Sequence, residues 1–532
     1  MNTTTLTRPS PSHAGVPADR RHAALALARV EGIRLLRHPL TIAAVLFLAG
    51  IWVSGWFTNE ANRYPILQDV DRDTELGMML LLGGAALIAS NLAVLRPHRT
   101  GTAALGDVLV LPQPLRTAAH LLALLPLGLL AAVLAVARVA VLAVAPAAGR
   151  PNPYELATGP VTVLLLGALG VLFGRLSRSA IVAPLALLVL LATLIVVPLL
   201  WPSPTAPARW LQPVVPEGDA AFVLPAPVHL MTRHAGPHLV YLIGLVGLVA
   251  VAALARGGAR TARTAPAAAV GLAVVLVGGI LQAAPPSRSV LDARIAAEQR
   301  PSTQQTCRTL SQVTYCAFPD FTRWIPGWDA QVRGVLRWVP AARAQQPIAV
   351  RQRIVMQGNG SPLVAGWTAD DLAAGTPDAV TVDTRWGDSR SAARLAGFVA
   401  YRVVTGQRPG IGPLCGARRV TVSWLAGQAS PASHTGLRLL AEQQDGDGEF
   451  GVFLQEAASG FGVLLPRREL TMALALLDRP ADEVGARVLA AWDELTAPGT
   501  TTERAAEILG VPVPPASQPG TAAPPDKRGE CP

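Results

Sequence analysis

The sequence predicts an α-helical polytopic membrane protein with seven spans, followed by a soluble α+β domain. Long apolar runs recur through the first 281 residues of the 532-residue chain, and most approach the roughly 20 apolar residues that cross a ~30 Å hydrocarbon core. The arginines between these runs fall mainly in alternate connections. The runs cover residues 40–56, 76–95, 119–144, 160–174, 180–201, 239–254 and 265–281.

The distribution of charge between the apolar runs predicts their orientation in the membrane. The N-terminal segment and every second connection after it contain 14 arginines and three acidic residues, whereas the other three connections contain five arginines and eight acidic residues. Arginine-rich connections stay in the cytoplasm. We therefore expect a multi-pass plasma-membrane protein with a cytoplasmic N-terminus and an extracytoplasmic C-terminal domain.

The formal net charge of +10 belongs to the membrane part of the chain. Residues 1–281 contain 20 basic and 11 acidic residues, whereas residues 282–532 contain 25 basic and 24 acidic residues. The basic side chains are therefore expected to face the anionic inner leaflet of a lipid membrane, and no nucleic-acid partner is expected.

Composition divides the chain into five parts. Residues 1–21 are rich in Ser, Thr and Pro and are expected to be a disordered cytoplasmic N-terminus. Residues 22–39 have an amphipathic pattern that ends at Pro39, which predicts a helix lying on the inner membrane face. The membrane domain covers residues 40–281, the extracytoplasmic α+β domain residues 282–510, and a Pro-rich disordered tail residues 511–532.

The connection between the second and third runs contains the best candidate for a cytoplasmic contact surface. Thr102 can cap a short helix that Pro112 ends. Leu105, Val108 and Leu109 would share one face of that helix. An apolar face on a short cytoplasmic helix is suited to binding another protein.

Local patterns predict both strands and helices in the C-terminal domain. The last predicted helix carries a capping box from Thr500 to Glu503 and ends before Gly510. The expected strands are residues 345–356 and 379–384, and the expected helices are residues 389–405, 481–495 and 501–509.

All four cysteines lie in the part of the chain assigned to the outside, where disulfides persist. Cys307 and Cys316 flank a stretch that can turn back on itself as a hairpin, and we expect them to form a disulfide. Cys415 is left either to pair with Cys531 or to remain free.

Several kinds of catalytic site lack their key residues. The single lysine is Lys527, in the tail, so a Walker nucleotide site cannot form. His434 is the one histidine after residue 281, which excludes a metallopeptidase site with clustered histidine ligands. Asp445, Asp447 and Glu449 have the look of a calcium loop without its later bidentate Glu, and a solvated turn is the favoured interpretation. We expect neither catalytic residues nor a cofactor or metal.

Two polar side chains within the spans are candidates for a substrate path. Arg138, near the outer end of the third span, either snorkels to the membrane interface or faces a substrate. Asn91, near the inner end of the second span, is either a helix-packing group like its neighbour Ser90 or a transport ligand. Snorkelling and helix packing are the favoured interpretations.

Four features together resemble a known family. The chain resembles the permease subunit of type 2 ATP-binding-cassette (ABC) exporters, particularly those of high-GC actinobacteria. The resemblance covers residues 22–254. The features are the interface helix with Glu31, Arg34, Arg37 and Pro39; the segment with Arg99, Gly101, residues 102–111, Pro112 and Arg116; the order of six spans; and the long connection before the sixth.

This resemblance implies a function, partners and a contact site. Such a permease would export its substrate, expected here to be hydrophobic or amphipathic, using ATP hydrolysed by a separate cytoplasmic subunit. It would work as a dimer with a second copy or a sister subunit. The segment after the second span would be the coupling helix that docks on the ATPase, with Thr102, Leu105, Asp107, Val108 and Leu109 as its residues.

The sequence also departs from that family. Many relatives carry a glutamate after the Gly-Thr pair, where this chain has Ala103 and Ala104 and offers Asp107 instead. The seventh span and the C-terminal domain are additions to the six-span plan. Some relatives carry a fused aminopeptidase there, but this domain lacks the His-Glu-x-x-His ligands.

A second class of function stays open on the sequence. The spans could merely hold the C-terminal domain, as in a membrane-anchored extracytoplasmic binding or assembly protein without transport activity. A membrane enzyme acting on cell-wall precursors would need a convergent polar site on the outer loops, and the available carboxylates form no compelling pair. An ATPase gene beside this one would favour the exporter.

Overall fold

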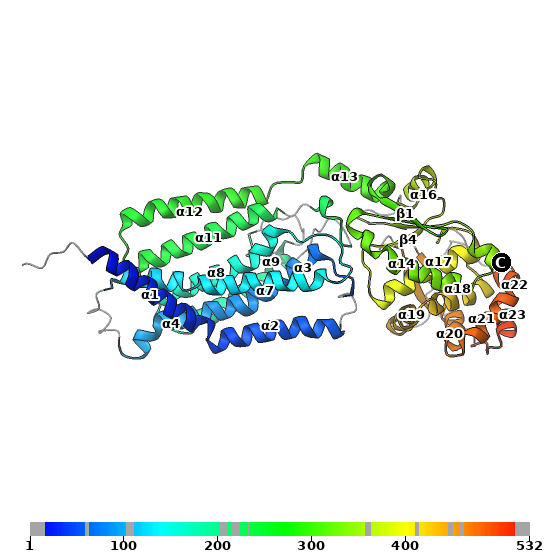
Figure 1. Cartoon of the computed structure of the whole chain (residues 1–532), viewed down its shortest axis with the longest axis horizontal. Coiled ribbons are helices and arrows are strands. Elements are labelled where there is room, and N and C mark those ends of the chain that lie inside the picture. The colour runs from blue at the N-terminus through cyan, green and yellow to red at the C-terminus, as the bar shows by residue number, and fades with distance from the viewer. Residues whose placement is uncertain are drawn as a thin grey trace, which may run out of the picture.

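The computed structural model describes residues 16–58, 63–102, 111–201, 211–213, 224–231, 234–356, 363–409, 414–444, 451–456 and 462–515. A bundle of long helices forms one half of the molecule, and a domain of helices and strands forms the other (Figure 1). Within these residues, seven helices are long and apolar enough to cross a membrane, as expected of a helical membrane protein. Each overlaps one of the seven predicted runs. They are Pro39–Thr58, Thr74–Arg99, Gln113–Ala143, Pro153–Leu176, Val182–Leu200, Ala235–Arg256 and Thr261–Gln282.

The helix before the bundle, α1 (Val16–Leu36), begins at Val16, although the sequence pattern predicted a disordered segment to residue 21 and a helix only from residue 22. The third span is divided between α6 and α7 just before Pro126, which has no N–H to donate to the preceding turn. The elements of the bundle are α2 (Pro39–Thr58), α3 (Leu67–Gly77), the π-helical turn η3 (Met78–Gly83), α4 (Gly84–Arg99), α6 (Gln113–Leu122), α7 (Leu125–Ala143), α8 (Pro153–Leu176), α9 (Val182–Leu200), η4 (Val228–Leu230), α11 (Ala235–Arg256) and α12 (Thr261–Gln282).

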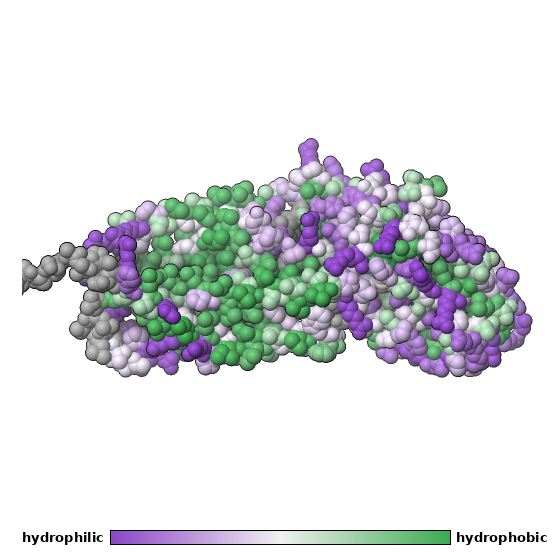
Figure 2. All heavy atoms as spheres, in the orientation of Figure 1, coloured by the Kyte–Doolittle hydropathy of each residue, from purple (hydrophilic) through white to green (hydrophobic). Residues whose placement is uncertain are grey.

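The spans differ in how far the rest of the protein covers them. The rest of the protein buries 78% of the apolar stretch of the second span and 61% of that of the fourth. It buries only 6% of the apolar stretch of the fifth span and 6% of that of the seventh. The helices α4 and α8 therefore form the centre of the bundle, while α9 and α12 expose Leu, Ile and Val side chains. In Figure 2 the exposed apolar residues of the bundle form a hydrophobic band between a more hydrophilic end near α1 and the C-terminal domain.

Glycines allow the central helices α4 and α8 to lie very close together. A Cβ placed on Gly170 would lie 2.1 Å from the Ser90 side-chain oxygen and 2.2 Å from the Leu87 carbonyl oxygen. The Ser90 hydroxyl donates to the Gly167 carbonyl at 2.8 Å. Gly174 completes a Gly-x-x-x-Gly spacing with Gly170, which is typical of closely packed helices in membranes.

The C-terminal domain contains a four-stranded sheet of order β1-β2-β3-β4 and a two-stranded sheet, β5-β6, within the described residues. The first pair is antiparallel, and β2, β3 and β4 are parallel. The strands β3 and β4 confirm the two predicted strands, 345–356 and 379–384. The bounds are β1 (Thr306–Leu310), β2 (Val313–Ala317), β3 (Ile348–Gln352), β4 (Val380–Val382), β5 (Val452–Gln455) and β6 (Gly462–Leu465).

One face of the larger sheet packs on the apolar core and the other is polar. Val350, Val380 and Val382 belong to the core cluster, together with side chains from α14 and α17. Arg351 and Thr381 are paired across β3 and β4, and because side chains alternate along a strand they face away from that core.

The helices of the C-terminal domain surround these sheets (Figure 1). The predicted helix 389–405 is α17, whereas the predicted helix 481–495 is divided into α21 and α22 at Ala491. The helices are α13 (Arg288–Gln299), η5 (Pro301–Gln304), η6 (Pro319–Trp324), α14 (Ile325–Leu336), α15 (Ala341–Ala344), α16 (Leu363–Ala373), α17 (Ser389–Thr405), α18 (Ala417–Gln428), α19 (Pro431–Gln444), α20 (Arg467–Leu477), α21 (Ala481–Ala490), α22 (Trp492–Thr496) and α23 (Thr502–Leu509).

The cap of the last helix corrects one prediction. The side chain of Thr501, not Thr500, accepts a hydrogen bond from the Arg504 backbone N–H at 3.2 Å. The Thr500 hydroxyl instead donates to the Glu494 carbonyl at 2.6 Å. Gly510 ends the helix with φ +65°, as predicted.

Two connections between helices of the bundle, one containing Tyr64 and the other Pro146, contact the C-terminal domain. The ring of Tyr64 packs edge-on against Trp324 and Trp386, with centroid distances of 6.5 and 6.2 Å. The indole N–H of Trp324 donates to the Pro146 carbonyl at 2.9 Å. Gly387 has φ +108°, and a Cβ there would lie 2.8 Å from the Tyr64 side chain. The aromatic contact thus depends on a glycine at this position.

Candidate functional site

The arginine-rich end of the bundle is organised around the buried side chain of Glu31 on α1. Its carboxylate accepts hydrogen bonds from Arg34 at 2.7 Å and from Arg96, near the end of α4, at 2.8 Å. Glu31 is 3% exposed, whereas both arginines keep part of their side chains in solvent. This ion pair ties the predicted interface helix to the second span, next to the point where the predicted coupling segment begins.

The predicted coupling segment is described only at its two ends. The Thr102 backbone N–H donates to the Pro97 carbonyl at 2.9 Å, and its hydroxyl lies 2.9 Å from that of Thr100. At the other end the Arg116 guanidinium donates to the Leu111 carbonyl at 2.8 Å. The other predicted coupling residues lie outside the described residues and stay predictions: Leu105, Asp107, Val108 and Leu109.

The two candidates for a substrate path lie on different helices and make separate contacts. The Arg138 guanidinium lies over the ring of Trp52, 5.5 Å from its centroid, so it links α7 to α2. Asn91 is fully buried, and its side-chain N–H₂ contacts the Gly170 carbonyl at 3.5 Å. This contact joins α4 to α8 and fits the helix-packing interpretation of Asn91. A substrate role for either residue stays a prediction.

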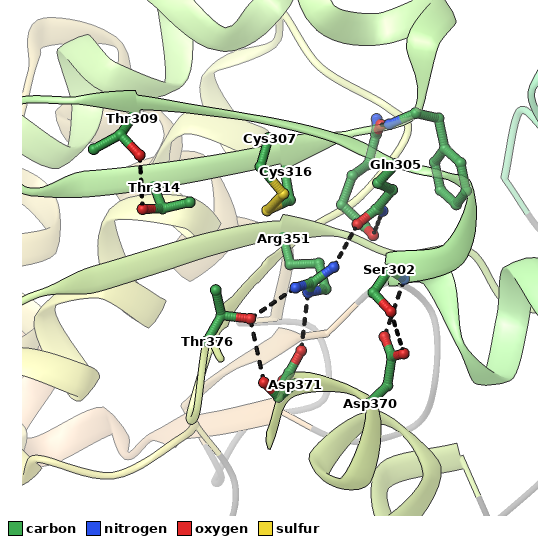
Figure 3. The surroundings of a disulfide bond; sticks show 12 residues. Ser302, Gln305, Cys307, Thr309, Thr314, Cys316, Arg351, Asp370, Asp371 and Thr376 are labelled. Carbon is green, nitrogen blue, oxygen red and sulfur yellow. Dashed lines mark hydrogen bonds and ion pairs between the residues drawn. A yellow bond between two sulfur atoms is a disulfide. The ribbon is translucent and has the colours of Figure 1, made fainter. Parts of the chain in front are cut away.

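The predicted disulfide between Cys307 and Cys316 is present (Figure 3). The two residues are direct partners on β1 and β2, with Cα atoms 4.0 Å apart. Cys415 is also disulfide-bonded, and its partner lies outside the described residues. The possible calcium loop with Asp445, Asp447 and Glu449 lies outside them as well.

A cluster of buried arginines covers the polar face of the sheet. Arg351, Arg353 and Arg408 are each at most 1% exposed. Arg351 and Arg353 sit on and just after β3, and Arg408 follows α17. Figure 3 shows Arg351 between the sheet and α16, with its guanidinium directed at Asp371 and Thr376.

Two buried carboxylates pair with these arginines. Asp371, on α16, lies 3.0 Å from the Arg351 guanidinium and is also bound by Arg353. Glu456, just after β5, lies 2.9 Å from Arg408. Burial lowers the pKa of Arg353 to about 10 although Asp371 raises it, so the guanidinium is still charged at neutral pH.

A pocket at the carboxyl end of β4 adjoins the arginine cluster. Thr381 lines this pocket and also accepts a hydrogen bond from the Arg353 guanidinium at 2.9 Å. Asp383 lines it too, and burial raises the pKa of this carboxyl to about 6, against the effects of the Arg385 backbone N–H at 2.8 Å and the Arg394 guanidinium at 3.8 Å. The carboxyl ends of parallel strands are the usual place for ligand sites in such sheets.

Comparisons of the chain with family models, with curated proteins and with solved structures found no match. The likeness to exporter permeases therefore rests on the pattern of the sequence.

The arginine cluster and the pocket were not predicted from the sequence. A local signal was present, since Arg351 and Arg353 occupy alternate positions in a segment that reads as a buried strand. Charged side chains on one face of such a strand indicate buried partners. Asp371 follows Arg353 by 18 residues and Glu456 follows Arg408 by 48 residues, so spacing alone could not name either partner.

Proposed function

We propose that the chain is the transmembrane permease subunit of an ABC exporter, which expels a hydrophobic or amphipathic substrate using ATP hydrolysed by a separate cytoplasmic subunit. The observation that carries this proposal is the ion pair of Glu31 with Arg96. It joins the interface helix to the span that leads into residues 102–111. A push on that segment from a partner would thus act on both elements together.

The packing of the bundle supports a route for such a push. Movement at the arginine-rich end of α4 would pass to α8, because these helices are in backbone-close contact at Gly170. The second span also contains the π-helical turn Met78–Gly83, a local break in regular helix that is often found at functional sites. The weakly covered helices α9 and α12 leave apolar surface for lipid and for a second permease subunit.

Co-purification with the ATPase tests the proposal. The full-length chain is expressed together with the product of the ABC ATPase gene that the proposal expects beside its own. The chain is then purified in detergent, and the amount of bound ATPase is measured. The double variant Leu105→Asp and Val108→Asp places charge on the predicted contact face, and we expect it to reduce ATPase binding and ATP-dependent efflux at least tenfold. Leu372→Asp is the matched control, because Leu372 is 70% exposed on α16 in the C-terminal domain.

Equal ATPase binding by wild type and double variant would contradict the coupling surface. Failure of the wild type to bind any nucleotide-hydrolysing subunit would contradict the exporter itself. That second result would favour a membrane-anchored extracytoplasmic binding or assembly protein. The specific support for this alternative is the docking of the C-terminal domain through Tyr64 and Trp324, which would hold it at a defined position on the bundle.

A further inference from the structure

Asp320, in the short helical turn η6 of the C-terminal domain, binds two connections of the bundle at once. Its carboxylate accepts a hydrogen bond from the Val228 backbone N–H at 2.7 Å, in the connection between the fifth and sixth spans. Its backbone carbonyl accepts one from the Gly149 N–H at 3.0 Å, in the connection between the third and fourth spans. A hydrogen bond to a carboxylate is stronger than one between neutral groups. Asp320 thus joins connections that are far apart in the sequence.

Trp324, at the end of the same turn, adds the remaining connection of the first six spans. Its indole N–H donates to the Pro146 carbonyl at 2.9 Å, again between the third and fourth spans. Its ring packs edge-on against Tyr64, which lies between the first and second spans. One turn of six residues therefore contacts all three connections that join these spans in pairs.

The three connections are also bound to one another. The Ala148 backbone N–H donates to the Pro65 carbonyl at 2.8 Å, and the Leu67 N–H donates to the Ala148 carbonyl at 2.9 Å. The side-chain N–H₂ of Gln68 donates to the Ala226 carbonyl at 2.9 Å. Each connection is thus held both by η6 and by a neighbouring connection.

Apolar burial makes these contacts costly to separate. Ala148, Ala226 and Leu230, from the connections, belong to the same apolar core cluster as Phe321 and Trp324 of η6. Each of the five is at most 5% exposed. Parting the connections would expose this apolar surface and break hydrogen bonds of buried backbone groups, and both changes are unfavourable.

We propose that the C-terminal domain acts as a clamp on the bundle: through η6 it holds the adjoining ends of the first six spans together, so that these spans move as one body. The clamp rests on the contacts alone. Its consequence for transport rests on the exporter proposal. In an exporter built this way, the opening that releases the substrate lies between two permease subunits and not among the spans of one.

Hydrogen–deuterium exchange of the full-length protein in detergent tests the clamp without a transport assay. The variant Asp320→Ala removes the acceptor of the Val228 N–H and leaves the hydrogen bonds between the other two connections in place. We expect exchange to be at least tenfold faster at Val228 and about threefold faster at Ala148 and Leu67, because release of one connection loosens the others. Asp292→Ala is the matched control, because Asp292 is exposed on α13, and its exchange should equal that of the wild type.

Trp324→Phe is the second variant, and it keeps the clamp testable if Asp320→Ala does not fold. It retains an aromatic ring beside Tyr64 and loses the indole N–H that binds the Pro146 carbonyl. We expect about threefold faster exchange at the Val228 N–H, which binds Asp320 and not Trp324. A rise confined to the connection that loses its own hydrogen bond would overturn the clamp, as would no rise at all.

An engineered disulfide tests the consequence for transport. Ile66 and Ala148 are bridge partners from two connections, and paired backbones lie about 5 Å apart, within the separation that a disulfide spans. The double variant Ile66→Cys and Ala148→Cys should form this bond under oxidising conditions. Its ATP-driven efflux should stay within about twofold of that of each single variant, which is the matched control. Loss of efflux when the bond forms would show that the connections must part, and would overturn movement as one body.

The two experiments can fail separately. Absence of ATP-driven efflux by the wild type would contradict the exporter proposal. The exchange rates of the wild type and its variants would still decide whether the clamp exists, because they require neither ATP nor a substrate.

Discussion

At the scale of the residue, burial decides the properties of the charged side chains in the C-terminal domain. Arg353 stays charged at neutral pH because its lowered pKa of about 10 is still far above 7. Asp383 behaves differently, because burial moves the pKa of its carboxyl to about 6, within the range that ordinary buffers cover. Its side chain is 11% exposed, and the nearest cation, Arg394, is 3.8 Å away.

We expect the stability of the protein to fall as pH rises through the region of this pKa. The folded pKa of Asp383, about 6, is above the value of about 4 in the unfolded chain, so the folded state binds the proton more tightly. The stabilisation is complete below about pH 4 and is lost between about pH 4 and pH 6. Asp383→Asn should therefore stabilise the protein by roughly 2–3 kcal/mol at pH 8 and have little effect at pH 4.

Thermal unfolding from pH 4 to pH 8 measures this difference. Asp378→Asn is the control, because Asp378 is more exposed, at 38%, and its substitution should change Tm little at any pH. A lower Tm for Asp383→Asn than for wild type at pH 8 would show that the Arg394 pair outweighs the cost of burial.

At the scale of the element, close helix packing distinguishes the central spans from the outer ones. Apolar periodicity and length identify α4, α8, α9 and α12 equally well as spans. Their glycines differ, however, because Gly170 faces the backbone of a neighbouring helix, whereas Gly247 on α11 has nothing within 4 Å of a Cβ. Only the packed helices show which glycine is required.

We expect Gly170→Ala to destabilise the bundle by about 1–3 kcal/mol. Its methyl group would meet the Leu87 carbonyl, which belongs to the backbone and cannot turn aside as a side chain could. Gly247→Ala, with the same change in open space, should leave the Tm unchanged or raise it, because alanine is the better helix former. The Tm values of the two variants in detergent check the expectation, and equal values would contradict the close packing of α4 and α8.

At the scale of the whole molecule, the alternate connections of the bundle gather at opposite ends. The helix α1, whose Glu31 pairs with Arg96, lies at the end of the bundle away from the C-terminal domain (Figure 1). Tyr64 and Pro146, from two other connections, contact Trp324 of that domain. A chain that crosses a membrane seven times must place successive connections at opposite ends of the bundle, and this arrangement meets that requirement. The side of the membrane on which each end lies is a prediction from the arginine distribution.

Labelling of engineered cysteines tests that orientation. Thr303→Cys, after α13, should react with a membrane-impermeant maleimide in intact cells, and Thr261→Cys, at the start of α12, should react only after the cells are opened. Both positions are exposed, and no described native cysteine is free to react. The reverse pattern would place the arginine-rich end outside and would remove the basis for an ATPase partner.

The sequence by itself determined the features that depend on neighbouring residues. The number of spans follows from apolar length, the β1–β2 hairpin and its disulfide from two cysteines nine residues apart, and α17 from its own periodicity. The tertiary structure decided what depends on distant residues, such as the meeting of Arg353 with Asp371 and Arg408, or of Tyr64 with Trp324 and Trp386. Local composition limits which helices and strands can form, whereas burial and charge balance arise only when separate parts of the chain come together.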